Sequence, residues 1–316
     1  MSITNDEALA SLRLLTAIAK ADGVLAPEEQ DALASAAGQM TLPTGVTVSS
    51  LLEEKHDVGA ILAELKSPEA KRHAYESAYS MARADGTIDP SEAAILEQAR
   101  KALNVDPKSV GFLDRVFSET KDTFLLSNIQ PIADATAREK EIKEDIVKYA
   151  TMTAVLGLFP VPGVAIATDL VAVGLQTKLV RDIGQYFGHK MDDAALKALM
   201  VALGGSTTMR IAVNNLAKFI PGFGSGFAAA TNFASTYAFG KVGEAYFASG
   251  QKLEPKLLKE GFKNALDDGK KLFGMHKKDV EKKKSDTEAK IQALQADLEA
   301  GKLTQAEYQK KVAELA

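Results

Sequence analysis

Two long uncharged stretches, each with a proline–glycine turn, most constrain what this chain can fold into. The first covers residues 149–168 and contains Phe-Pro-Val-Pro-Gly at residues 159–163, and the second covers residues 219–240 and opens with Phe-Ile-Pro-Gly. Proline ends a helix and glycine permits a tight return, so each stretch predicts an apolar helix, a turn and another apolar helix. Both hairpins need a second apolar surface to pack against: each other, a partner protein or lipid.

The predicted helical arms of this apolar region are short compared with a bilayer. The first arm, residues 146–159, reaches about 21 Å at about 1.5 Å per residue, whereas a hydrocarbon core is about 30 Å thick. Longer arms acquire charges such as Asp169 and Arg181. Three arrangements stay open, namely a bundle buried within the protein, a hairpin that inserts shallowly into a membrane, and a full span. The predicted arms are 146–159, 164–187, 194–203, 206–220 and 227–247.

Charge is distributed unevenly along the 316 residues. Residues 1–145, the acidic head, carry a net charge of −10, while residues 146–250 and 251–316 carry +3 each. The acidic head argues against nucleic-acid binding, and the basic remainder suits an anionic membrane or an acidic partner. Seven lysines between residues 270 and 284 indicate either a solvated helix or linker, or attraction to lipid headgroups.

Residue types that several kinds of chemistry require are absent or scattered. The chain has no cysteine, which excludes disulfides, thiolate catalysis and cysteine-ligated metal centres. Its four histidines lie far apart, and no phosphate-binding loop, nucleophile elbow or zinc-protease helix occurs. We therefore expect no enzymatic activity and no cofactor. The first residues lack the basic and apolar regions of a secretory signal, so the expected location is the cytoplasm.

A motif in the acidic head occurs twice, 63 positions apart. Ala-Asp-Gly-Val-Leu-Ala-Pro-Glu-Glu at residues 21–29 returns as Ala-Asp-Gly-Thr-Ile-Asp-Pro-Ser-Glu at residues 84–92. Each copy follows one apolar helical pattern and precedes another, which predicts a helix–loop–helix unit used twice. Asp89, Pro90 and Glu92 fit an N-cap, a first-turn proline and the acidic partner of a capping box.

An EF-hand calcium loop also places Asp, Gly and Glu at this spacing. Its first and third ligand positions would fall on Ile18 and Lys20 in the first copy, and on Met81 and Arg83 in the second. A hard cation cannot use these side chains, so helix capping is favoured over a metal role.

The repeat, across residues 5–105, resembles the TerB-like family of tellurite-resistance and stress-associated helical domains. The resemblance rests on both Ala-Asp-Gly-x-(Leu/Ile)-x-Pro-x-Glu motifs. It implies a helical fold and a role in stress resistance. It also implies metal binding through acidic residues, which map here onto Asp22, Glu29, Asp85 and Glu92.

Residues 146–250 resemble the domain shared by YcjF-type membrane proteins and the C-termini of some bacterial small GTPases. The matching features are the Phe-Pro-x-Pro-Gly turn at 159–163, Leu-Gly-Gly at 203–205 and Phe-Ile-Pro-Gly-Phe-Gly at 219–224. This resemblance implies association with membranes and stress operons. No Walker lysine motif occurs, so any GTPase would be a separate partner.

The last residues predict a small helical hairpin. Gly301 ends one helix, and the segment from Thr304 to Glu307 forms the capping box of the next. Residues 301–308 resemble the core of the SHOCT short C-terminal domain, which implies a role in oligomerisation. Because a hairpin of this length buries little surface by itself, we expect it to dock on another surface.

Together these features predict an all-α protein made of five segments. The segments are a TerB-like helical domain (1–115), a helical linker (116–145), an apolar helical-hairpin domain (146–250), a Lys-rich linker (251–285) and a SHOCT-like hairpin (286–316).

The expected function is that of a non-enzymatic bacterial stress-associated adaptor or scaffold, peripheral to or partly inserted in the inner membrane. Expected partners are membrane lipids, a separate GTPase or stress protein, and further copies of the chain, but no nucleic acid. The alternatives are a membrane-inserting effector or pore former, and a metal-binding resistance protein acting through the acidic head. The residues expected to contact the membrane are apolar side chains at the turns: Val161, Val164, Phe219, Ile220 and Phe223.

We expect the head to bind calcium no better than millimolar, because apolar and cationic side chains occupy two ligand positions in each copy. Asp89→Ala should instead lower the free energy of unfolding by about 1 kcal/mol, since it removes a helix cap. Titration calorimetry and thermal unfolding check the two expectations. Micromolar calcium binding that disappears in Glu29→Gln and Glu92→Gln would contradict the first.

Overall fold

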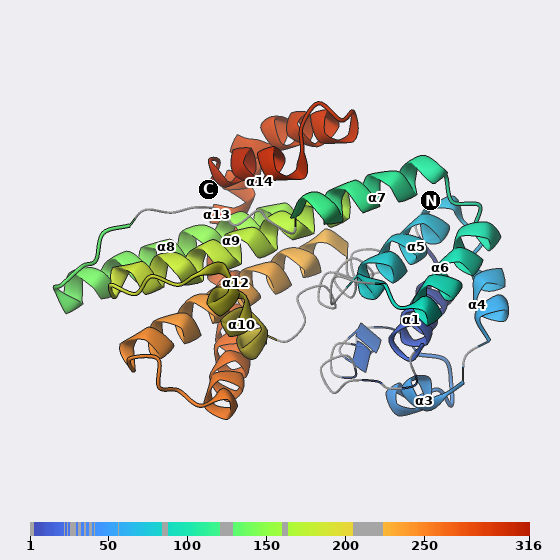
Figure 1. Ribbon diagram of the computed structural model, residues 1–316, viewed down its shortest axis with the longest axis horizontal. Helices are drawn as coiled ribbons and strands as arrows, with labels where there is room; N and C mark the ends of the chain where they lie inside the picture. The colour runs from blue at the N-terminus through green and yellow to red at the C-terminus, as the bar shows by residue number, and fades with distance from the viewer. Residues whose placement is uncertain are drawn as a thin grey trace. The chain divides into compact units, whose positions relative to one another are not determined.

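The structure is a computed structural model in which the regular elements are helices (Figure 1). Among the described residues there is no strand, which confirms the predicted all-α class. The chain divides into two compact units. The first holds α1, α3, α4, α5, α6 and most of α7, and the second holds α8, α10, α13, α14 and most of α9 and α12. The structure describes residues 3–21, 23, 25, 30, 33–34, 36–37, 40, 42–55, 57–83, 88–120, 129–159, 164–204 and 224–316.

In the first unit, α1 packs against α4 and α5. Glu7, in the first turn of α1, ties this helix to the start of α5, because its carboxylate accepts the backbone N–H groups of Lys66 (3.1 Å) and Ser67 (2.6 Å). Burial opposes its charge, but these bonds and the one from the Thr4 backbone lower the pKa of Glu7 to about 2. The helices are α1 (Asn5–Ala19), α3 (Val48–Glu53), α4 (Val58–Glu64), α5 (Pro68–Ala82), α6 (Pro90–Ala102) and α7 (Pro107–Thr120).

In the second unit, the uncharged parts of α8, α9 and α12 are buried, with side chains such as Leu156, Leu175 and Phe233 fully enclosed. Four of the five predicted arms correspond to helices, and the arm at 206–220 lies outside the described residues. The helices are α8 (Ala135–Gly157), α9 (Ala165–Tyr186), α10 (Asp193–Gly204), α12 (Gly224–Ala248), α13 (Pro255–Glu299) and α14 (Gln305–Ala313).

Small residues let these helices approach one another closely. A Cβ atom added at Gly157 of α8 would lie 2.7 Å from the backbone nitrogen of Ala229 on α12. One added at Gly269 of α13 would lie 2.8 Å from the Cα atom of Ala234, also on α12. The small residues of α12 therefore serve contact between helices inside the unit.

The 45-residue helix α13 runs through the predicted Lys-rich linker and across its predicted boundary at residue 285. The reason is that α13 has buried residues on one face along its length, including the lysine-rich part. The helix packs against α8, α10 and α14. α8 likewise begins at Ala135, inside the predicted helical linker. The buried residues of the α13 stripe are Leu258, Gly269, Val280, Thr287, Ile291, Gln295 and Leu298.

Two glycines of α13 give a matched test of this packing. Gly269→Ala should lower the free energy of unfolding by about 1–2 kcal/mol, because overpacking against the α12 backbone outweighs the better helix propensity of alanine. Gly274→Ala should raise it by about 0.5–1 kcal/mol, because a Cβ atom there meets nothing within 4 Å. Thermal or denaturant unfolding measures both, and equal effects would contradict the close crossing of α12 and α13.

Candidate functional site

Of the four predicted metal ligands, only Glu92 lies within the described residues. Its carboxylate accepts the backbone N–H of Asp89 at 2.9 Å, and Pro90 follows as the first residue of α6. This confirms the predicted capping box of the second motif copy. No cluster of three or more His, Cys, Asp or Glu able to hold a metal occurs in the part of the chain that the structure describes. The residues outside that part are Asp22, Glu29 and Asp85.

Of the five predicted membrane-contact residues, the structure describes only Val164, directly before α9, and its exposed fraction is 0%. Val161, Phe219, Ile220 and Phe223 lie outside the described residues. Among the described helices, none combines the length and the hydropathy that crossing a membrane requires.

A polar network lies inside the apolar bundle and joins three helices. The hydroxyls of Thr153 on α8 and Thr236 on α12 share a hydrogen bond of 2.7 Å. The amide of Gln176 on α9 donates to Thr236 (3.1 Å), and that of Asn232 on α12 donates to the backbone oxygen of Thr153 (3.2 Å). Since buried polar groups need partners, this network fixes the register of α8, α9 and α12.

A second polar row lies where α8 and α9 run side by side (Figure 1). Tyr186 donates to Asp145 at 2.8 Å, and Tyr149 donates to Asp182 at 3.2 Å. Lys178 pairs with the same Asp182 carboxylate, which is 1% exposed. The other oxygen of Asp182 has no hydrogen-bond partner among the described residues.

Burial governs the ionisation of this row. It raises the pKa of Asp145, and the nearby charge of Asp182 adds to the effect, although the hydrogen bond from Tyr186 opposes it. Burial and the adjacent carboxylates likewise raise the pKa values of Tyr149 and Tyr186, so both hydroxyls remain protonated donors. The row therefore joins helices by neutral donors and carboxylate acceptors.

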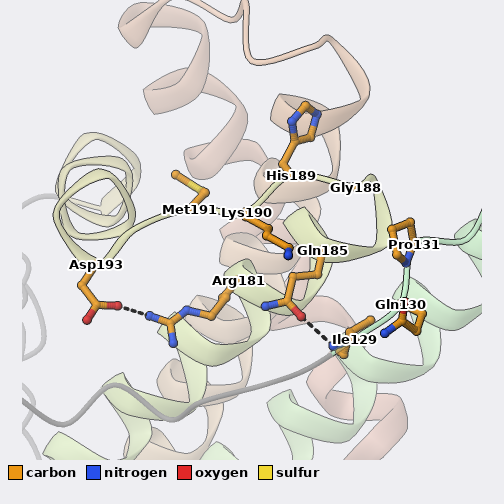
Figure 2. A pocket seen from close by; sticks show the side chains of 10 residues that line it. All are labelled: Ile129, Gln130, Pro131, Arg181, Gln185, Gly188, His189, Lys190, Met191 and Asp193. Atoms are coloured by element: carbon orange, nitrogen blue, oxygen red, sulfur yellow. Dashed lines mark hydrogen bonds and ion pairs between the residues drawn. The ribbon is translucent and has the colours of Figure 1, made fainter.

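A hollow of about 430 Å³ lies beside the end of α9 (Figure 2). Three of its polar side chains are engaged: Arg181 pairs with Asp193, and the Gln185 side-chain carbonyl accepts the backbone N–H of Ile129 at 2.7 Å. The helix ends here because Gly188 adopts a positive φ of 83°. The hollow is lined by Ile129, Gln130, Pro131, Arg181, Gln185, Gly188, His189, Lys190, Met191 and Asp193.

The C-terminal helix α14 docks on α9, mainly through polar groups. Tyr308 is fully buried and its hydroxyl shares a 3.2 Å hydrogen bond with Thr168, which also accepts from Gln295 at 3.1 Å. Gln305 donates to the backbone oxygen of Ala167 at 2.9 Å. The side-chain oxygens of Gln295 and Gln305 find no donor among the described residues, and each such buried group costs about 1–3 kcal/mol.

Sequence reasoning predicted that this hairpin docks on another surface, but it did not identify α9 as that surface. The predicted capping box of α14 is confirmed, with Thr304 accepting the backbone N–H of Glu307 at 3.2 Å, and Gly301 has the positive φ of a helix stop. The sequence feature that could have indicated a polar docking surface is the presence of two glutamines on the inward face of α14. That face consists of Gln305, Tyr308, Gln309 and Val312.

Comparison of the chain with family models, curated proteins and solved structures found no match. The resemblances to TerB-like, YcjF-type and SHOCT domains therefore stay predictions that rest on the motifs.

The raised pKa of Asp145 predicts how stability depends on pH. A group whose pKa is higher in the folded than in the unfolded state stabilises the fold at low pH, and this contribution is lost as pH rises through the folded pKa. Asp145→Asn should therefore be neutral or stabilising at pH 7 and lose that advantage as pH falls towards 4. Melting temperatures of both proteins across pH 4–8 measure the difference. A variant that is equally destabilised at every pH would contradict the assignment.

Proposed function

We propose that this protein is a non-enzymatic bacterial stress-associated adaptor that binds the inner face of the membrane through its apolar turns while its helical bundle stays folded. One observation carries the proposal: the uncharged parts of α8, α9 and α12 are buried within the second unit. The apolar surfaces of these three helices are therefore covered by other parts of the protein. In the sequence, Val161, Phe219, Ile220 and Phe223 stand beside proline–glycine turns, where polar residues are usual, and we propose that these side chains contact lipid. Val164 is buried and is not part of this contact.

The polar networks support an adaptor role. The Thr153 network and the Asp145–Tyr186 row each link one helix to another, so their hydrogen bonds specify packing. Buried polar groups of this kind favour one arrangement of the helices over others. A bundle with one fixed arrangement suits a protein that presents surfaces to partners. The proposed partners are a separate GTPase or stress protein, and further copies of the chain.

Charge on α13 supports binding to an anionic membrane. The helix exposes Lys270, Lys271, Lys277 and Lys278, although Asp267 and Asp268 pair with the first two at 3.1 and 3.3 Å. Each lysine near an anionic surface contributes about 1 kcal/mol. The same helix exposes Met275, at 73%, between these lysines.

Vesicle binding by aspartate variants tests the proposal. Val161→Asp and Phe223→Asp should each weaken binding to vesicles of mixed phosphatidylcholine and phosphatidylglycerol by about tenfold or more, because a large apolar side chain buried in lipid contributes about 1.5–3 kcal/mol. Val201→Asp is the matched control, since Val201 is an apolar residue of α10 that is 48% exposed, away from the turns in sequence. It should bind as the unmodified protein does. Sedimentation with vesicles and melting temperatures are the measurements.

The outcomes separate the competing functions. If the unmodified protein ignores vesicles and both turn variants melt at much lower temperature, the turns belong to a closed core and the protein is a scaffold without membrane contact. If binding occurs but amide exchange in α8, α9 and α12 rises sharply on vesicles, the bundle has opened and the membrane-inserting effector is the better account. Binding with unchanged protection of these helices supports the adaptor.

A further inference from the structure

The hollow beside the end of α9 is bounded by hydrogen bonds within the second unit, to which all of its lining residues belong (Figure 2). The backbone N–H of Ile132 donates to the Tyr186 carbonyl at 3.0 Å, so the segment that precedes α8 is held against α9. The turn that follows α9 is closed by the backbone N–H of His189, which donates to the Gly184 carbonyl at 2.8 Å. The walls of this hollow are therefore formed by the fold itself, as those of small-molecule sites usually are.

Two cationic side chains line this hollow. Arg181 comes from α9 and Lys190 from the turn after it, while Asp193 is the one acidic residue of the lining. The Lys190 side chain is directed toward Gln185, which stands four residues after Arg181 and hence on the same face of α9 (Figure 2). Both cations thus border one space, and the lining has an excess of positive charge.

The ion pair between Arg181 and Asp193 is asymmetric in its burial. The side chain of Arg181 is 7% exposed, whereas that of Asp193 is 60% exposed. A buried guanidinium requires an anion beside it, because an uncompensated buried charge is costly. An exposed carboxylate loses little when it turns into water, so another anion can take its place on Arg181.

A phosphate group is the anion that suits this arrangement. Its oxygens accept the parallel N–H bonds of a guanidinium, and its second charge suits a nearby ammonium. The hollow of about 430 Å³ has room for a phosphate group with a small organic remainder. Ile129, Pro131 and Met191 offer that remainder apolar contact.

We propose that this hollow binds a phosphate ester, with Arg181 and Lys190 as its anion-binding residues and the Asp193 carboxylate as an internal competitor for Arg181. Two sources share this chemistry, a free phosphate ester and the headgroup of a phospholipid. The site goes beyond the proposed membrane function and does not depend on it.

Two exposed residues test the site with effects of opposite sign. Lys190→Gln should weaken the binding of glycerol 3-phosphate by threefold or more, because it removes a cation from the lining. Asp193→Asn should strengthen it by threefold or more, because the competing carboxylate is gone. Both side chains lie at the surface, so both variants should fold. Titration calorimetry at constant ionic strength is the measurement.

Lys290→Gln is the matched control. It removes the same charge as Lys190→Gln, but from an exposed position of α13 that does not line the hollow. Its affinity for glycerol 3-phosphate should equal that of the unmodified protein. An equal loss of affinity in both lysine variants would assign the binding to net charge and overturn the site.

Thermal unfolding gives a second readout. Glycerol 3-phosphate should raise the melting temperature of Asp193→Asn more than that of the unmodified protein. The reason is that a ligand bound only by the folded state stabilises it, and here the ligand restores an anion beside the buried Arg181 guanidinium. Sodium chloride at the same ionic strength should not reproduce the difference.

Vesicles identify the source of the phosphate. Opposite shifts of the two variants with glycerol 3-phosphate alone assign a free ester, and opposite shifts that appear with phosphatidylglycerol vesicles assign a lipid headgroup. The proposal is overturned if neither probe shows them, or if Asp193→Asn binds more weakly than the unmodified protein. Vesicle binding by the unmodified protein tests only the membrane function, so the two failures are distinguishable.

Discussion

Close contact between helix backbones is the constraint on which the second unit depends. At Gly157 and Gly269 the backbones of α8 and α13 come so near to α12 that a methyl group would collide with it. Such contact requires alanine, glycine and threonine on α12, and these residues bury little area each, so stability must come from many close atomic contacts. The hydroxyls of Thr153 and Thr236 then select one register among the many that small residues permit.

This constraint also changes what the uncharged stretches imply. In the sequence they indicate a need for an apolar surface and leave open whether protein or lipid supplies it. In the structure α8, α9 and α12 supply that surface to one another. The membrane proposal accordingly depends on the turns, where the sequence already placed the membrane-contact residues, and not on the buried helices.

Local features were predictable, and long-range ones were not. The capping boxes at Asp89 and Thr304 and the stop at Gly301 follow from residues within one or two helical turns. For the lysines of α13 the sequence left a solvated helix and a linker open, and the inward position of Val280 belongs to the helix.

The partners of buried polar side chains were beyond a single sequence. Asp145 and Tyr186 stand 41 positions apart, and Thr168 and Tyr308 stand 140 apart. Nothing in the spacing of such residues says which helix faces which, because that depends on how complete helical surfaces fit together. The polar row and the identity of α9 as the surface on which α14 docks therefore appeared only with the fold.

Because α13 is one unbroken helix, a change in its number of residues rotates every part of the chain that follows. Its 45 residues extend about 68 Å, and each residue turns the helix by about 100°. In a flexible linker, one residue added among the exposed lysines changes almost nothing. In α13 the same insertion turns everything beyond it by more than a quarter of a revolution, so Gln295 and the helix that carries Tyr308 no longer face Thr168. The lysine-rich stretch is thus free in composition on its exposed side and fixed in its number of residues.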